Sequence, residues 1–276
     1  MSQKRRILSP DELSFIPVSA GLRNSVLQLV FASGHKSMDE VKQERQVTDL
    51  KKILELLSDV AKNPFKTLTA RRNLSFGNST SDLFRVKDKA RKIGCAIQVI
   101  TKATRGPGQK GIYLELTRKG VEFLIENRLW KKDKPYYSGK MGFSGALLVH
   151  GLLIPHFEER GLKALIEGIN KGYDCDIGII GDDNSLEIAI ELSVFTSAKQ
   201  ELVNIRRDIE SGWKRIISVV VFFERKDDEM VENELKTREK AKSFFEYFSI
   251  HLSLDELNRI EIRCISEFRK KANNER

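Results

Sequence analysis

The run Arg215-Ile-Ile-Ser-Val-Val-Val-Phe-Phe223 constrains the fold of this chain more than any other segment. Apart from Ser218, every residue after Arg215 is apolar, so the run lacks the polar alternation of a strand with one wet face. A continuous apolar strand has to be covered on both of its faces. The run therefore predicts a buried strand inside an α/β arrangement.

The segments around this strand predict a regular order of elements in the C-terminal half. A helix is expected to begin near Phe143, and the later elements are, in order, strands over 162–168, 173–180 and 186–192, a helix over 197–210, the buried strand, a charged helix over 230–248 and a strand over 260–264. Gly181-Asp-Asp-Asn-Ser185 has the composition of a hairpin turn between the second and third strands. A helix, a three-strand meander, a helix and a buried strand predict a domain with a central mixed sheet.

Two carboxylates lie on neighbouring strands of this meander. Asp176 is on the second strand and Glu191 is on the third, 15 residues later (191 − 176). On adjacent antiparallel strands joined by a short turn, both side chains can point to the same face. Such a pair could bind a Mg²⁺ ion, which would polarise a phosphodiester and lower the pKa of an attacking water.

The element order and the two acids resemble the restriction-endonuclease-like, or PD-(D/E)xK, nuclease superfamily. That family places an Asp on the second strand and Glu-x-Lys on the third, so the resemblance implies that Asp176 and Glu191 are catalytic metal ligands. Ser193 stands at the position of the family's lysine and cannot supply its charge. Lys199, one turn into the next helix, is expected to reach back instead. An active Mg²⁺-dependent deoxyribonuclease, a degenerate domain that does not cleave, and a different α/β fold all remain open.

Positive charge is concentrated in one part of the chain. Residues 62–140 contain 19 Lys and Arg against 6 Asp and Glu, a net charge of +13 (19 − 6). Residues 141–276 contain 20 and 25, a net charge of −5 (20 − 25). A basic segment of this kind attracts a polyanion such as DNA. A solvated surface without a partner is the alternative.

The basic segment predicts its own order of elements. The expected elements are a helix from Val47 to the stop at Asn63-Pro64, a second helix over 65–74, a third over 81–92 capped by Ser79 or Thr80, strands over 95–101 and 111–116, and a helix from Thr117 to about Arg128. A basic loop rich in Gly and Pro joins the two strands. Two helices, a turn, a third helix and a hairpin therefore precede the C-terminal half.

This order resembles a winged helix-turn-helix domain. Tyr113-Leu-Glu-Leu-Thr-Arg-Lys-Gly120 is similar to the step that closes the wing in many prokaryotic members. The resemblance implies that the third helix enters the DNA major groove and that the wing tip follows a phosphate backbone. The expected DNA-binding residues are Arg85, Lys87, Lys89, Arg91 and Lys92 on the helix and Lys102, Arg105 and Lys110 on the wing. A winged helix used only for protein contacts is the alternative.

A further resemblance covers several segments of the chain. Residues 188–192, 204–213 and 215–220, with the upstream helix that carries His150, are similar to nuclease-like domains found behind DNA-translocating ATPases of the HerA type. The sequence contains no Gly-x-x-x-x-Gly-Lys-Ser/Thr loop, so the motor itself is absent. The resemblance implies a stand-alone relative of the accessory region, with such an ATPase as a partner.

The sequence therefore predicts an α+β or α/β chain with an N-terminal extension (1–46), a winged-helix domain (47–130), a linker (131–140) and a restriction-endonuclease-like domain (141–276). The widely spaced Cys95, Cys175 and Cys264 are typical of free thiols in a reducing cytoplasm. No apolar run approaches the roughly 20 residues that span a bilayer, and no secretory signal is evident. We expect a DNA-binding protein of a DNA-processing or mobile-element system. A regulator, a scaffold for an ATPase and a homodimer remain open.

Overall fold

The computed structural model describes residues 38–102, 110–131, 142–166 and 175–269, with side chains described from residue 43 onward. Residues 1–37 of the predicted N-terminal extension, Arg105 on the wing tip and nearly all of the predicted linker lie outside the described residues. Internal contacts divide the chain into Met1–Leu54 and Glu55–Arg276. No helix in the described part of the chain is long and apolar enough to cross a membrane.

Helix α2 (Met38–Lys62) begins earlier than predicted and ends, as predicted, before Asn63-Pro64. The predicted helix over 65–74 is wrong, because only a short 3-10 turn, η2 (Leu68–Ala70), forms there. The buried guanidinium of Arg71 explains the difference. It donates to the carbonyl oxygens of Asn63 at 2.8 Å and Lys66 at 2.9 Å. The Lys66 carbonyl is the one to which the backbone N–H of Ala70 would donate in an α-helix.

The remaining predicted elements of this part are confirmed as α3 (Thr80–Lys92), β1 (Ala96–Thr101), β2 (Gly111–Leu116) and α4 (Arg118–Glu126). Ser79 caps α3 by accepting a hydrogen bond from the Asp82 N–H. Gly94, with φ at +74°, ends the helix in a conformation that favours glycine. β1 and β2 pair antiparallel along their whole length.

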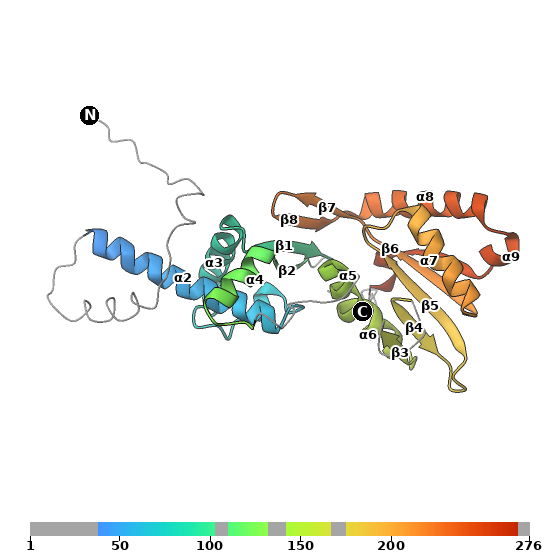
Figure 1. The fold of residues 1–276 in the computed structure, drawn as a ribbon, viewed down its shortest axis with the longest axis horizontal. Coiled ribbons are helices and arrows are strands. Elements are labelled where there is room, and N and C mark those ends of the chain that lie inside the picture. The colour runs from blue at the N-terminus through green and yellow to red at the C-terminus, as the bar shows by residue number, and fades with distance from the viewer. Residues whose placement is uncertain (1–37, 103–109, 132–141, 167–174, 270–276) are drawn as a thin grey trace, which may run out of the picture. The chain divides into compact units, whose positions relative to one another are not determined.

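The larger sheet has the order β3-β4-β5-β6-β9 (Figure 1). Its strands are β3 (Ala164–Ile166), β4 (Ile177–Ile180), β5 (Leu186–Ser193), β6 (Arg215–Val220) and β9 (Ile260–Cys264). β3, β4 and β5 form an antiparallel meander, and β6 and β9 add to it in parallel. β6 is buried from its second residue onward, so the mixed sheet with a buried strand is confirmed.

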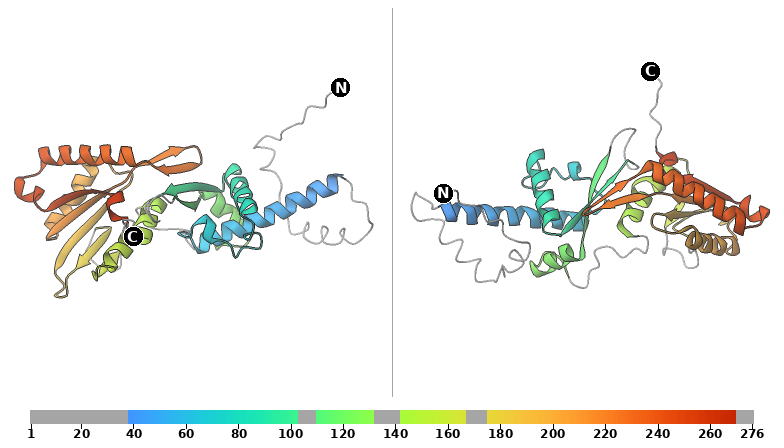
Figure 2. Two further views of the ribbon diagram at one scale, coloured as in Figure 1. Left: turned by 180° about the vertical axis from the view of Figure 1, so that it is seen from behind. Right: turned by 90° about the horizontal axis from the view of Figure 1, so that it is seen from above.

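Helices cover both faces of this sheet (Figure 2). The helical stretch on one face consists of α5 (Gly142–Leu148), the π-helical turn η3 (Val149–Leu153) and α6 (Ile154–Glu158), and the other face carries α7 (Ala198–Glu210) and α8 (Glu234–His251). Ile190 and Ile217 pack with the first set, whereas Ala189 and Ile216 pack with the second. Adjacent residues of a strand point to opposite faces, so two hydrophobic cores result.

One hairpin is absent from the sequence-based prediction. β6 ends at Val220, and β7 (Phe223–Lys226) and β8 (Glu229–Glu232) follow before α8 begins. The prediction that Phe223 ends the buried strand and that the long helix starts at Met230 is therefore wrong. β8 pairs in parallel with β1, so a second mixed sheet has the order β2-β1-β8-β7. This sheet joins strands from the two predicted domains.

Two short elements complete the C-terminal half, namely α9 (Leu254–Leu257) and the 3-10 turn η4 (Ile265–Phe268). Ser253 begins α9 with a capping box, in which its hydroxyl accepts from the Glu256 N–H and the Glu256 carboxylate accepts from the Ser253 N–H. The three cysteines are free thiols, as the sequence predicts.

Candidate functional site

The structure brings the two predicted carboxylates together. Ile177 of β4 pairs with Ile190 of β5, so Asp176 and Glu191 form the next opposed pair in the same register. The Asp176 carboxylate accepts a hydrogen bond from the Leu192 N–H at 2.7 Å. This bond holds Asp176 against the end of β5, on the face that carries α7.

Glu191 lies in a buried cluster of acids. Its exposed fraction is 4%, and the α7 residues Glu201 and Asp208 are each 1% exposed. Burial, followed by the charges of Asp176 and Asp208, raises the pKa of Glu191 far above its ordinary range. One Arg207 nitrogen lies 3.4 Å from Glu191 Oε1 and supplies a cation at the edge of the cluster. Burial and the neighbouring acids therefore favour the protonated form of Glu191.

Sequence reasoning missed Glu201 and Asp208, although a signal was present. Both residues lie on the inward face of α7, which Leu202 and Ile205 mark by their burial. Charged residues on an inward helix face are uncommon unless they have partners. The polar Ser218 inside apolar β6 is the partner of Glu201, because its hydroxyl donates to Glu201 Oε1 at 2.6 Å. Burial nevertheless raises the pKa of Glu201 to about 7.

Lys240 of α8 lies beside the end of β5. Its ammonium donates to the carbonyl oxygens of Val194 at 2.8 Å and Ser193 at 3.1 Å. Burial lowers the pKa of Lys240 to about 8. Lys199, in contrast, is exposed and makes no hydrogen bond or ion pair with Asp176 or Glu191 among the described residues. The expected reach of Lys199 toward the carboxylates is therefore not seen.

Carboxylate oxygens are suitable donors for Mg²⁺, but their arrangement here does not fit the ion. Within the described ranges, no group of three or more His, Cys, Asp or Glu side chains is placed to hold a metal ion. Glu191 is buried, and the guanidinium of Arg207 lies beside it. A carboxyl group that is buried and already faces a guanidinium is poorly placed to bind a hard cation.

Two of the predicted DNA-binding residues are used inside the protein. The Lys87 side chain is only 7% exposed, and its ammonium donates to Gln98 Oε1 at 2.7 Å. Arg91 donates to both carboxylate oxygens of Asp228, each at 2.7 Å, and lies 2.8 Å from a Glu229 oxygen. These contacts connect α3 to β1 and to the turn before β8, so neither cation lies on an open DNA-binding face.

The other predicted contacts lie nearer to solvent. Arg85 and Lys92 on α3 and Lys110 at the start of β2 are exposed, and Lys89 is half-buried. Arg85 pairs with Asp82 at 3.0 Å, one turn earlier on α3. The described residues of this part therefore offer exposed cations on one helix and at the base of the β1–β2 loop.

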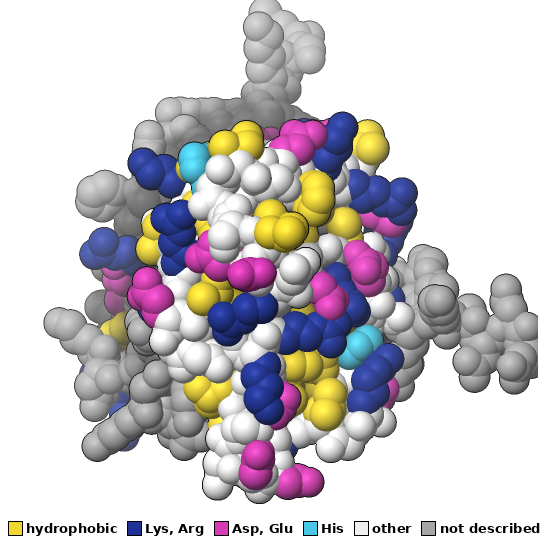
Figure 3. All heavy atoms as spheres, turned by 90° about the vertical axis from the view of Figure 1, so that its right-hand side faces the viewer, with side chains coloured by type: hydrophobic (Ala, Val, Ile, Leu, Met, Phe, Trp, Pro, Cys, Tyr) yellow, Lys and Arg dark blue, Asp and Glu magenta, His cyan; other side chains and the backbone are white. Residues whose placement is uncertain are grey.

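The end of the C-terminal half that carries α9 has a different surface. Figure 3 shows Lys and Arg side chains there mixed with Asp and Glu and with apolar side chains. This mixture agrees with the net charge of −5 over residues 141–276 (20 − 25). The basic excess of the chain therefore belongs to the N-terminal half.

Comparison of the chain with models of protein families, with curated proteins and with solved structures finds no match. The resemblances to winged-helix and nuclease-like proteins thus stay predictions from the sequence. The function is argued below from the residues and their geometry.

Proposed function

We propose that this chain is a DNA-binding protein that combines a winged helix with a restriction-endonuclease-like domain that does not cleave DNA. The order of α2, η2, α3, the β1–β2 hairpin and α4 supports the first part. The order of α5–α6, the β3-β4-β5 meander, α7 and β6 supports the second. The β1–β8 pairing gives the two parts a shared sheet.

The exposed cations of α3 carry the DNA-binding proposal. Arg85 and Lys92 are exposed on a helix that occupies the third position of the winged-helix order. They belong to the segment 62–140, whose net charge is +13 (19 − 6). Cations on a reading helix neutralise phosphates and release counterions, which is the dominant source of affinity for DNA.

The buried acidic cluster supports the absence of cleavage. Hydrolysis of a phosphodiester by this fold requires ionised carboxylates that a metal and a water can reach. Glu191 is 4% exposed, and burial together with its acidic neighbours raises its pKa, which disfavours the ionised form. Lys240, which lies beside the end of β5, already donates to three backbone carbonyl oxygens, those of Ser193, Val194 and Val221.

Binding of duplex DNA by charge-matched variants tests the proposal. We expect Arg85→Ala, Lys89→Ala and Lys92→Ala together to weaken binding at least 10-fold at low salt. The control removes three exposed cations from the other half by Lys199→Ala, Arg238→Ala and Lys242→Ala. Because both triple variants lose the same charge, a general field effect would weaken both equally. Equal loss in the two would therefore contradict a binding face on α3.

Incubation with duplex and branched DNA in Mg²⁺ or Mn²⁺ tests the second half of the proposal. We expect no strand cleavage by the wild-type chain. Cleavage that disappears in Glu191→Ala would instead establish a metal-dependent deoxyribonuclease. That result would overturn the non-cleaving assignment and leave DNA binding through α3 untouched.

A further inference from the structure

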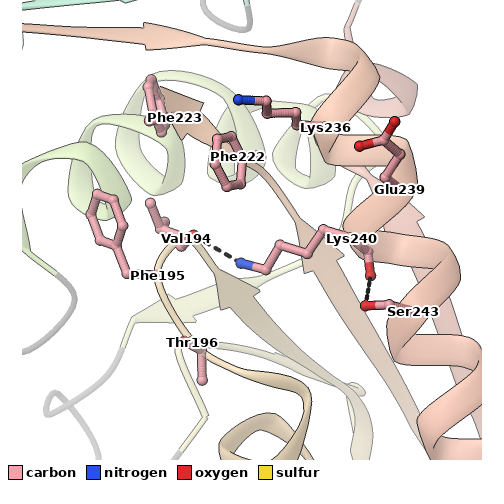
Figure 4. A pocket seen from close by; sticks show the side chains of 9 residues that line it. All are labelled: Val194, Phe195, Thr196, Phe222, Phe223, Lys236, Glu239, Lys240 and Ser243. Carbon is pink, nitrogen blue, oxygen red and sulfur yellow. Dashed lines mark hydrogen bonds between the residues drawn. The ribbon is translucent and has the colours of Figure 1, made fainter. Parts of the chain in front are cut away.

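A pocket opens where β5 and β6 end (Figure 4). Its walls are the loop after β5, the residues between β6 and β7, and one side of the first half of α8. The carboxyl ends of parallel strands are where open α/β sheets bind ligands. β5 and β6 are parallel neighbours, so this pocket lies at such an edge.

Two phenylalanines supply aromatic surface to the pocket. Phe195, in the loop after β5, is 69% exposed, and Phe222, directly before β7, is half-buried. Figure 4 shows Phe222 between the α8 lysines and the loop, with Phe195 on the far side of Val194. An aromatic ring exposed at a pocket mouth provides a face on which a planar ligand can stack.

Two lysines line the same pocket from α8. The Lys236 ammonium lies 5.4 Å from the centre of the Phe222 ring and 3.2 Å from Glu224 Oε1. Lys240 enters the pocket floor, where it donates to the carbonyl oxygens of Ser193 and Val194. Glu239 is the acid in the lining, so the pocket itself has more cationic than anionic side chains.

Aromatic surface beside lysine is the chemistry that recognises a base and its phosphate. A nucleobase stacks on an aromatic ring whatever its identity, and a nearby ammonium attracts the phosphate that follows it. The Thr196 and Ser243 hydroxyls also line the pocket and can hydrogen-bond to a polar ring edge.

We propose that this pocket binds an unpaired nucleobase with its adjacent phosphate, as single-stranded DNA presents them, through Phe195, Phe222 and Lys236. The inference rests on the proposed function as a DNA-binding protein. It adds a second contact, for single strands, at a distance in sequence from the duplex-binding helix α3. A DNA-processing protein with both contacts would hold a junction between duplex and single strand.

Binding of a labelled thymidine oligonucleotide of about ten residues tests this site, since single-strand sites span roughly that length. Phe195→Ala should weaken binding about 5- to 100-fold, which is the range for loss of one base–aromatic stack. Lys236→Ala should weaken binding. It should also make the slope of log affinity against log salt shallower by about 0.7, the value for one phosphate contact with a single strand. The controls are Phe245→Ala and Lys242→Ala, which remove an exposed ring and an exposed cation at other positions on α8 and should leave oligonucleotide binding unchanged.

Three further measurements locate the bound base. A photoreactive thymidine in the oligonucleotide should crosslink to the peptide containing Phe195 or Phe222. Competition by thymidine monophosphate would show that a free nucleotide suffices, whereas competition only by oligonucleotide would identify a strand. Duplex binding by Phe195→Ala should equal that of the wild-type chain.

Unchanged oligonucleotide binding by Phe195→Ala and Lys236→Ala would overturn the inference, as would a crosslink confined to α3. Either result leaves duplex binding through Arg85, Lys89 and Lys92 intact. Conversely, if the chain binds the oligonucleotide through Phe195 but does not bind duplex DNA, the proposed duplex function is contradicted and this single-strand site is supported.

Discussion

Gly120 lies where α4 meets the start of the β1–β2 hairpin. A Cβ atom added there would stand 2.0 Å from the carbonyl oxygen of Cys95. Thr117 caps α4 by accepting from the Gly120 N–H at 3.0 Å, and its hydroxyl donates to the Gly94 carbonyl at 2.6 Å. The Leu-Thr-x-x-Gly step therefore has a physical basis, since its threonine and glycine hold α4 against the end of α3.

Gly120→Ala is expected to lower the free energy of unfolding by roughly 2–4 kcal/mol, because backbone atoms at Cys95 have to move. Lys119→Ala is the control, since that side chain is exposed and its loss should cost less than about 0.5 kcal/mol. Urea denaturation of both variants measures the difference. Equal stabilities for the two would contradict the close approach at Cys95.

Glu201 should make stability depend on pH. Its pKa is about 7 in the folded chain and about 4.3 in an unfolded one, so the folded state holds the extra proton between these values. The free energy of unfolding therefore falls as pH rises through this window. Between roughly pH 5 and pH 7.5, the free energy of unfolding of the wild-type chain should fall by about 2 kcal/mol more than that of Glu201→Gln. Denaturant titrations at the two pH values measure this, with Glu246→Gln as an exposed control that keeps the wild-type profile.

Individual residues differ in how well the sequence predicts them. The opposed pair Asp176 and Glu191 follows from strand periodicity and a short turn, and the structure contains it. Lys87 and Arg91, in contrast, look like Arg85 in the sequence. Their partners Gln98 and Asp228 come from other elements, and Asp228 lies 137 residues beyond Arg91. A pattern along one helix cannot separate a cation that faces DNA from one that faces the protein.

At the scale of elements, the β7–β8 hairpin likewise could not be predicted from a local sequence pattern. β7 and β8 are short and mostly charged, with burial patterns that include a single fully buried residue each. Such strands lack the apolar alternation by which a strand is recognised. Their stability as a sheet comes from pairing with β1, which is far away in sequence. By contrast, β4, β5, β6 and β9 carry strong local patterns and were predicted.

The junction between α3 and this hairpin gives a prediction at the same scale. Asp228→Ala removes a bidentate partner from Arg91, whose side chain is 11% exposed. We expect the free energy of unfolding to fall by about 1–2 kcal/mol. The loss is no larger because solvent partly screens the Asp228 side chain and because Glu229 still pairs with Arg91.

Hydrogen exchange should report the same change locally. Amides of β1, including that of Val99, should exchange faster in Asp228→Ala than in the wild-type chain. Glu122→Ala is the matched control, because it breaks an exposed pair with Arg118 and should leave exchange in β1 unchanged. Unchanged β1 protection in Asp228→Ala would contradict a structural role for this ion pair.

At the scale of the whole molecule, the mixed sheet of the C-terminal half could be predicted because its strands are apolar and its helices amphipathic. The connection between the halves could not, because the β1–β8 pairing and the Arg91–Asp228 pair join residues more than 100 positions apart. The uneven distribution of charge can be read from the sequence, because the net charge is +13 over residues 62–140 (19 − 6) and −5 over residues 141–276 (20 − 25). The division is consistent with the proposal that the N-terminal half contacts duplex DNA.

The salt dependence of duplex DNA binding tests this account most directly. For the wild-type chain, log affinity should fall linearly with log salt between about 50 and 200 mM, with a slope of about −0.9 for each neutralised phosphate. In the variant with Arg85, Lys89 and Lys92 changed to Ala, the slope should become shallower by about 2 to 3. The variant with Lys199, Arg238 and Lys242 changed to Ala should keep the wild-type slope. Identical slopes for all three proteins, or no duplex binding even at about 50 mM salt, would contradict the assignment of α3 as a DNA-binding helix.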